Sequence, residues 1–278
     1  MSSSRHGIVV VLALLMFALP ILAEELDISP RQQETYVWCW IAVGQMVFEF
    51  YDVPNVNPGG DYQCGIVGLL AAGTMRQDCA FQCQNCTVPA GSSAGVTSMI
   101  EDYPRRVAVV SDDEVPRLSV SYGRTALTFA RVQREIDNRH PIIAGISPSG
   151  KPPAWASSQH VALIVGYDDD GDEPRLLVND PYPFTTPNPY AAADAESNGD
   201  GSYWISYDRF RDSLNWRESF VVSQVGTYRP TPKGDYCCFI GPYGPDACPL
   251  NLSGRLPLGS PCICTYPAAR FAGRVCNP

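Results

Sequence analysis

The stretch Gln33-Glu34-Thr35-Tyr36-Val37-Trp38-Cys39-Trp40-Ile41-Ala42 decides how the rest of the chain is interpreted. Cys39 stands where a loop is expected to become an apolar helix, with a tryptophan on each side and a glutamine six residues upstream. The amino end of a helix carries partial positive charge and unpaired backbone N–H groups. It therefore favours a thiolate, the nucleophilic form of cysteine, and its amides can hold an oxyanion. These features are typical of a cysteine hydrolase.

The pattern of apolar residues predicts two kinds of structure on either side of Pro104. Before it, helical spacing predicts a buried helix from Cys39 to Tyr51 and further helices at 62–75 and 93–102. After it, the chain becomes mostly extended, apart from a helix that Thr125 opens. Strands are expected at 118–122, 142–146, 159–167, 175–179, 202–206 and 219–225. The sequence thus predicts an α+β fold in which a helical half packs against an antiparallel, strongly curled sheet.

The first residues indicate export. Arg5 and His6 precede an apolar run from Ile8 to Leu22, and Ala23 offers a small residue before two glutamates. This order describes a secretory signal peptide, and the run is shorter than the roughly 18 residues of a membrane-spanning helix. We expect a signal peptide at 1–23 with cleavage after Ala23 and a secreted or periplasmic protein, against a retained membrane anchor as the alternative.

The formal net charge of −9 and the pI near 4.8 exclude some partners. An acidic surface repels nucleic acid and anionic membranes. We therefore expect no nucleic-acid partner and no membrane partner after signal cleavage.

Eleven cysteines in an exported chain imply a disulfide framework with at least one thiol left over. Setting Cys39 aside leaves four in the amino-terminal half and six from Cys237 onward. We expect structural disulfides confined to each half, with Cys39 as the free thiol. The Cys83-x-x-Cys86 pair leaves a redox or zinc motif as the alternative. Residues 231–278 are expected to form a small disulfide-held appendage.

A thiol nucleophile needs a base and a group that orients the base. Of the histidines after the signal peptide, His140 sits at a helix end, whereas His160 opens an apolar strand. The next strand ends in Asn179-Asp180, and a hairpin between the two strands would bring its end beside His160. His160 is therefore the expected base, and either Asp180 or Asn179 can orient it.

An acidic run, Asp168-Asp169-Asp170-Gly171-Asp172-Glu173, resembles a metal loop at first sight. It lacks the alternating ligands and the distal glutamate of a calcium loop. We expect a solvated hairpin turn there, and no metal or cofactor in the protein.

Taken together, these residues resemble the papain-like cysteine proteases, and most closely the small bacterial AvrRpt2-like and C39-like peptidases. The resemblance spans roughly residues 32–225 and rests on Gln33 with Cys39-Trp40, on His160 with Gly166-Tyr167-Asp168, and on Asn179-Asp180-Pro181. It implies a Cys39, His160 and Asp180 catalytic set. Asp180 is preferred to Asn179 because an Asp-Pro follows the histidine strand in these bacterial groups. It also implies Gln33 as the oxyanion donor, with Gln32 as the fallback.

The resemblance further implies a papain-like two-lobed domain at 24–230, with a helical lobe at 24–116 and a β lobe at 117–230. It implies a secreted endopeptidase that hydrolyses protein or peptide substrates through a thioester, and we expect a monomer. One alternative is an acyl transferase of the transglutaminase kind that uses the same residues. Another is an inactive papain-fold binding or adhesion module, against which the intact set Gln33, Cys39, His160 and Asp180 speaks.

Overall fold

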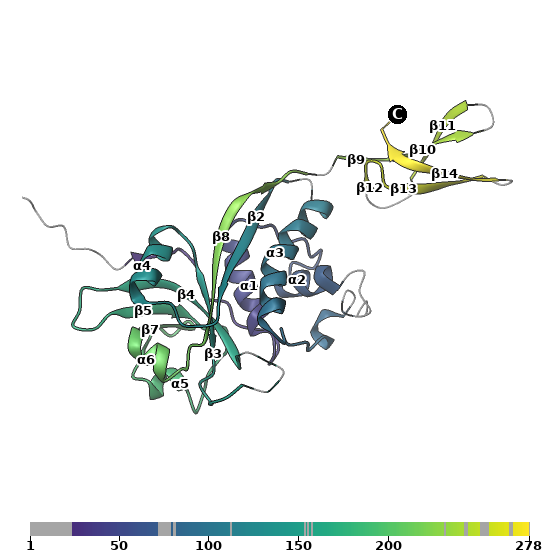
Figure 1. The fold of residues 1–278 in the computed structure, drawn as a ribbon. Coiled ribbons are helices and arrows are strands. Elements are labelled where there is room, and N and C mark those ends of the chain that lie inside the picture. Colours follow the sequence, from purple (N-terminus) through teal and green to yellow (C-terminus); the bar gives the residue numbers. More distant parts are fainter. Residues whose placement is uncertain are drawn as a thin grey trace, which may run out of the picture.

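The computed structural model describes residues 24–71, 79, 82–111, 113–152, 154, 156, 158–230, 232–241, 244–250, 256–266 and 269–277. The expected signal peptide at 1–23 and the last residues, 72–75, of the second expected helix lie outside this set. Figure 1 shows a larger body of helices and sheet, followed by a small tail of strands at the carboxyl end. The mixture of helices and antiparallel strands confirms the α+β class.

The first part of the body is helical. It contains α1 at Cys39–Phe50, α2 at Tyr62–Ala71, a 3-10 turn η2 at Cys83–Asn85, and α3 at Ser93–Val110. Trp38, Ile41 and Val47 are completely buried, so the start and middle of α1 lie inside the core. At Gly44 an added Cβ would collide with the Met99 sulfur of α3. Glycine at this position therefore lets α1 and α3 approach closely.

α3 is longer than the sequence predicts. The expectation that the helix ends near Asp102 and that the chain is extended after Pro104 is wrong, because α3 continues through Pro104 to Val110. A proline inside a helix removes one hydrogen bond and is normally disfavoured there. Tyr103 and Val107, on either side of it, are completely buried in the core. Burial of this helix face therefore outweighs the cost of the proline.

The second part of the body is an antiparallel sheet, seen beside the helices in Figure 1. Its strands are β1 at Glu24–Glu25, β2 at Val115–Gly123, β3 at Ile142–Ile146, β4 at His160–Asp168, β5 at Arg175–Asn179, β6 at Glu196–Ser197, β7 at Ser202–Ser206 and β8 at Glu218–Tyr228. The strand order is β2-β8-β3-β4-β5-β7-β6, and β1 pairs with β4. All five residues of β3 are buried. The expected strands are all present, most of them within two residues of their expected ends.

Three short helices flank the sheet: α4 at Phe129–Asp137, α5 at Pro189–Ala192 and α6 at Tyr207–Asp212. The sequence predicts that Thr125 opens α4, but the helix begins four residues later, after Thr128. Side chains of the sheet half bind the backbone of this approach segment. Ser219 donates to the carbonyl of Thr125, and Tyr207 donates to the carbonyl of Leu127. These bonds fix residues 125–128 outside the helix, and local sequence does not reveal them.

The tail has its own sheets. They comprise β9 at Lys233–Gly234, β10 at Tyr236–Gly241, β11 at Gly244–Pro249, β12 at Leu256–Pro257, β13 at Pro261–Tyr266 and β14 at Ala269–Cys276. The strand order is β11-β10-β14-β13, with β12 pairing β9 separately. Its buried apolar cluster is small and centres on Cys237, Phe239 and Cys264. A core of this size does not hold a domain together without crosslinks.

The disulfides confirm that the cysteines pair within their own halves. The body contains Cys64–Cys83 and Cys79–Cys86, and the tail contains Cys237–Cys262, Cys238–Cys276 and Cys248–Cys264. Cys39 is the free thiol. Across the described ranges, no helix combines the length and the apolar character needed to cross a bilayer.

Candidate active site

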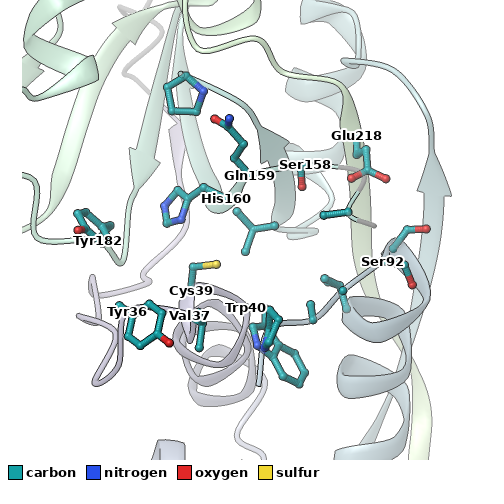
Figure 2. Close-up of a pocket in the computed structure, with 18 of the residues that line it drawn as sticks. Tyr36, Val37, Cys39, Trp40, Ser92, Ser158, Gln159, His160, Tyr182 and Glu218 are labelled. Atoms are coloured by element: carbon teal, nitrogen blue, oxygen red, sulfur yellow. The ribbon is translucent and has the colours of Figure 1, made fainter. Parts of the chain in front are cut away.

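Cys39 is the first residue of α1, as the sequence predicts. Trp38 occupies the cap position, and no side chain caps the helix. The first helical bond runs from the N–H of Ala42 to the carbonyl of Trp38, at 2.9 Å. The three N–H groups before it therefore have no acceptor within the helix. Figure 2 shows the Cys39 side chain rising from this end of α1 into the cleft that faces His160.

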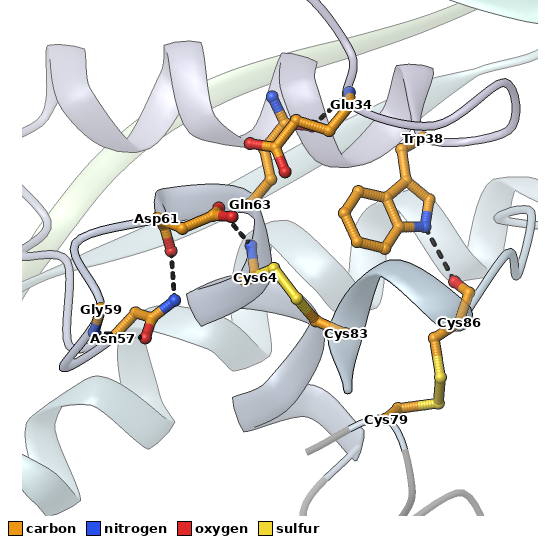
Figure 3. Close-up of a disulfide and its surroundings, with 10 residues drawn as sticks. All are labelled: Glu34, Trp38, Asn57, Gly59, Asp61, Gln63, Cys64, Cys79, Cys83 and Cys86. Atoms are coloured by element: carbon orange, nitrogen blue, oxygen red, sulfur yellow. Dashed lines mark hydrogen bonds between the residues drawn. A yellow bond between two sulfur atoms is a disulfide. The ribbon is translucent and has the colours of Figure 1, made fainter. Parts of the chain in front are cut away.

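The two tryptophans beside Cys39 fix the start of α1 to a loop that disulfides hold. The buried Trp38 indole donates to the carbonyl of Cys86 at 2.9 Å, and the Trp40 indole donates to the carbonyl of Val88 at 3.2 Å. Cys86 is crosslinked to Cys79. Figure 3 shows Trp38 reaching this disulfide from α1. The aromatic flanks of the cysteine therefore serve to position it.

His160 is the first residue of β4 and pairs with Ile146 across the ladder to β3. Its side chain is only 11% exposed. The rings of Tyr182 and Phe184 approach the imidazole edge-on, with centroids 6.1 and 6.0 Å away. The strand fixes the backbone of His160 and these aromatic rings limit how its side chain can turn.

Asp180 directly follows β5 and reaches His160 across the β4–β5 pair. Its Oδ1 lies 2.7 Å from His160 Nε2 and accepts the backbone N–H of Tyr182 at 2.8 Å. Its Oδ2 accepts the Tyr190 hydroxyl at 2.8 Å. Because a carboxylate only accepts hydrogen bonds, Nε2 of His160 carries a proton and Nδ1 is left for Cys39. The Asp180 side chain is completely buried, which holds this orientation.

Asn179, the other candidate for orienting the base, points elsewhere. Its Nδ2 donates to the carbonyl of Ile28 at 2.7 Å in the buried core. Successive residues of a strand point to opposite faces, so Asn179 and Asp180 have different partners. Asn179 ties the amino-terminal segment to the sheet, and Asp180 contacts the histidine.

The neighbours of His160 change its ionisation. Burial by itself lowers the pKa of His160, but charge interactions and hydrogen bonds with Asp180 and Cys39 outweigh burial and raise the pKa to about 10. The imidazolium form is therefore favoured at neutral pH. A protonated histidine between a thiol and a carboxylate can hold a thiolate in place and later deliver its proton.

Gln33 lies on the loop before α1, and its side chain is buried. Its Nε2 donates to the carbonyl of Thr35 at 2.7 Å, and its Oε1 has no partner among the described residues. The Thr35 carbonyl also accepts the N–H of Trp38. Gln33 thus braces the turn that leads into Cys39, and one N–H of its amide remains available. Gln32, the fallback for the same role, has an exposed side chain.

Cys39 and His160 face each other across a cleft with a volume of about 380 Å³. Figure 2 shows side chains from the start of α1 and α3 on one wall and from the sheet half on the other. Apolar residues such as Trp40, Val96 and Phe220 form much of the lining. A mostly apolar cleft with a few polar groups is typical of a ligand-binding site.

Three residues of the site were missed by sequence reasoning. Tyr190, which binds Asp180, lies on the four-residue helix α5, and nothing in the local pattern connects it to Asp180. Tyr182 and Phe184 follow the Asp-Pro of the orienting residue within a few positions. Because Tyr182 and Phe184 are close to Asp180 in sequence, their place near the site can be predicted from the sequence. The contact of Tyr190 with Asp180 becomes apparent only in the folded structure.

Asp168 ends β4, and residues 169–173 of the acidic run are exposed in the connection to β5, which agrees with the expected hairpin turn. Elsewhere in the described part of the chain, Asp61, Cys64 and Cys83 lie close enough to hold a metal ion. Cys64 and Cys83 are bonded to each other in a disulfide. Their sulfurs are therefore not available as thiolate ligands.

The comparisons with known proteins agree with this geometry. The family model described as Peptidase_C39-like matches residues 25–211, which include Cys39, His160 and Asp180. No curated protein sequence matches the chain. The matched region begins with β1 and ends within α6, so it spans both walls of the cleft. The chain belongs to the Peptidase_C39-like family of papain-like cysteine peptidases.

Proposed function

We propose that the protein is a secreted cysteine endopeptidase, in which Cys39 is the nucleophile, His160 the acid and base, and Asp180 the orienting residue. The observation that carries the proposal is the placement of His160, with Nε2 on the buried Asp180 carboxylate and the ring facing Cys39 across an apolar cleft. The substrate is a protein or peptide, taken without a cofactor by a monomeric enzyme. Within this family, the AvrRpt2-like peptidases are the proposed relatives.

In the acylation step, the Cys39 thiolate attacks the carbonyl carbon of the scissile peptide. A C–S bond forms, and the π electrons of the carbonyl move onto its oxygen. The tetrahedral intermediate then breaks its C–N bond as the His160 imidazolium gives its proton to the leaving amine. The products of this step are a free amine, a neutral imidazole and a thioester on Cys39.

The thioester is hydrolysed by water in a second step. Neutral His160 takes a proton from the water while the water oxygen attacks the carbonyl carbon of the thioester. The second intermediate breaks its C–S bond, which releases a carboxylic acid and returns Cys39 as thiolate beside imidazolium. Asp180 keeps the imidazole in the required tautomer throughout and remains unprotonated.

The developing oxyanion needs hydrogen-bond donors. We assign this role to the backbone N–H of Cys39 and to the Gln33 amide, which has one N–H beyond its bond to Thr35. Loss of one such donor typically lowers the rate about 100- to 1,000-fold. Gln33→Ala should show a loss in this range, whereas Gln32→Ala, a glutamine one position away with an exposed side chain, should not.

The proposed organisation is a signal peptide at 1–23, a papain-like two-lobed domain at 24–230 and a Cys-rich appendage at 231–278. The lobes would be 24–116 and 117–230. Glu24 and Glu25, which directly follow the proposed cleavage site, pair with β4 and so belong to the folded domain. The disulfides support an oxidising, extracytoplasmic location.

The direct test is peptide-bond hydrolysis by the mature protein and two histidine variants. His160→Ala should abolish hydrolysis, with an unchanged circular dichroism spectrum. His140→Ala is the matched control, because His140 bonds to Glu135 and is not part of the cleft lining. Hydrolysis that survives in His160→Ala contradicts the proposal. Products that carry an added amine in place of a free acid would identify the acyl transferase alternative.

A further inference from the structure

Glu218 is a buried acidic residue that the proposed mechanism does not use. It is 4% exposed, yet it lines the same cleft as Cys39 and His160. Figure 2 shows Glu218 and Ser92 on the opposite side of the cleft from Tyr36 and Tyr182, with Cys39 between them. A buried carboxylate costs free energy unless it finds partners. Its presence at one end of a substrate cleft therefore calls for a partner.

The fold directs the Glu218 side chain into the cleft. Glu218 begins β8, and Phe220, two residues further along the same strand face, also lines the cleft. Ser219, on the other face, turns away and bonds to the carbonyl of Thr125. Across the ladder, Glu218 pairs with Gly145 of β3. The orientation of Glu218 is thus set by the register of the sheet.

Gly145 leaves room for the carboxylate. An added Cβ at this position would lie 3.0 Å from Oε2 of Glu218 and 3.0 Å from Oγ of Ser158. Both of these atoms belong to residues that line the cleft. A side chain at Gly145 would therefore crowd the polar atoms of both residues.

One carboxylate oxygen is satisfied by the protein and the other is not. Oε1 accepts the Tyr122 hydroxyl at 2.6 Å. Within the described part of the chain, Oε2 accepts no hydrogen bond, and Glu218 forms no ion pair with a lysine or arginine. The protein therefore orients this carboxylate and leaves one oxygen for an external donor.

We propose that Glu218 is a specificity-determining residue that binds the cationic head of a lysine or arginine side chain of the substrate. The inference rests on the proposed peptidase function. The cleft that Cys39 and Glu218 line is also lined by Val96 and Phe220, against which the aliphatic stem of such a side chain can pack. The net charge of −9 also attracts basic chains during encounter.

The test uses fluorogenic peptides in which one position on the amino side of the scissile bond is occupied in turn by arginine, lysine, norleucine or glutamate. Norleucine keeps the aliphatic stem and lacks the charge. At one position, the kcat/KM for arginine should exceed that for norleucine by at least about tenfold, as expected for a charge-assisted hydrogen bond. Glu218→Gln should reduce this ratio to near one.

Glu173→Gln is the matched control, because it removes the same charge from the exposed β4–β5 turn and should keep the ratio. Glu218→Asp retains the charge on a shorter side chain and should keep a reduced preference for arginine. The inference is overturned if no position favours a basic residue over norleucine. It is equally overturned if Glu218→Gln retains the preference.

A binding experiment separates this inference from the proposed function. If the wild-type protein cleaves none of the peptides, the peptidase proposal fails by itself. Fluorescence anisotropy with Cys39→Ala protein then compares the arginine and norleucine peptides directly. Tighter binding of the arginine peptide, lost in Cys39→Ala/Glu218→Gln, supports the role of Glu218. Equal binding of the two peptides overturns it.

Discussion

The two walls of the cleft hold their catalytic residues by different means. On the helical wall, Cys39 is anchored through Trp38 and Trp40 to a loop that the Cys79–Cys86 disulfide closes. On the sheet wall, His160 begins β4, which pairs with β3 from His160 onward and with β5 further along. The sequence places no cysteine between residues 87 and 236.

The difference reflects what each wall can supply for itself. A sheet satisfies its own backbone and its alternate residues fill the core, so it needs no crosslink. The loop at 86–90 has no regular structure to hold it, and a disulfide reduces the disorder available to it. The position of the nucleophile should therefore depend on oxidation, and the position of the base should depend on the sheet and on buried hydrogen bonds.

The largest expected effect concerns the sheet wall. Asp180→Ala should lower kcat/KM about 1,000- to 10,000-fold, because the imidazole loses both its orientation and a stabilising charge. Asn179→Ala should change activity little, but it leaves the buried Ile28 carbonyl without its partner and should cost about 1–3 kcal/mol of unfolding free energy. Kinetics and thermal unfolding of both variants check this. If Asn179→Ala lowers kcat/KM more than Asp180→Ala does, then Asn179 and not Asp180 orients His160.

The next effect concerns the helical wall. Cys79→Ala/Cys86→Ala should lower the unfolding free energy by about 2–4 kcal/mol, and the displaced Trp38 should lower kcat/KM by up to about 100-fold. The matched control is Cys238→Ala/Cys276→Ala, which removes a disulfide from the tail. If both double variants keep full activity, the position of Cys39 does not depend on the Cys79–Cys86 disulfide.

A smaller effect concerns the pH profile. Asp180 raises the pKa of His160, which is about 10, so imidazolium is present below that pH and lost above it. Because the neutral amide of Asp180→Asn no longer stabilises the charged ring, the pKa should fall. The alkaline limb of kcat/KM should therefore move to lower pH in Asp180→Asn. A pH–rate profile of the residual activity measures this, and an unmoved limb would show that another group sets it.

The smallest effect concerns the second partner of Asp180. Tyr190→Phe removes the hydroxyl that donates to Oδ2 and should lower kcat/KM about fivefold, the equivalent of one ordinary hydrogen bond. Tyr182→Phe is the control, because Tyr182 contacts Asp180 through its backbone N–H and not through its hydroxyl. Equal effects of the two changes would mean that the hydrogen bond from Tyr190 to Asp180 does not contribute to catalysis.

Much of the fold could be predicted because apolar spacing and turn residues act locally. The strand at Ile142–Ile146 and the helix from Cys39 are clear in the sequence for this reason. Pro104 inside α3 and the late start of α4 could not be predicted, since burial and long-range side-chain bonds override the local signal. In the site, the positions of Cys39 and His160 follow from the local pattern, whereas the preference for Asp180 over Asn179 rests on the family resemblance. Tyr190 reaches Asp180, and Glu218 reaches the cleft, only through tertiary packing and sheet register.

The measurement that tests the central claim most directly is labelling of the mature, oxidised protein with a thiol-directed epoxide inhibitor, followed by peptide mapping. The label should be found on Cys39, peptide hydrolysis should stop in proportion to labelling, and His160→Ala should slow the labelling strongly. Label on another cysteine, or hydrolysis that continues after Cys39 is fully modified, would contradict the assignment of Cys39 as the nucleophile.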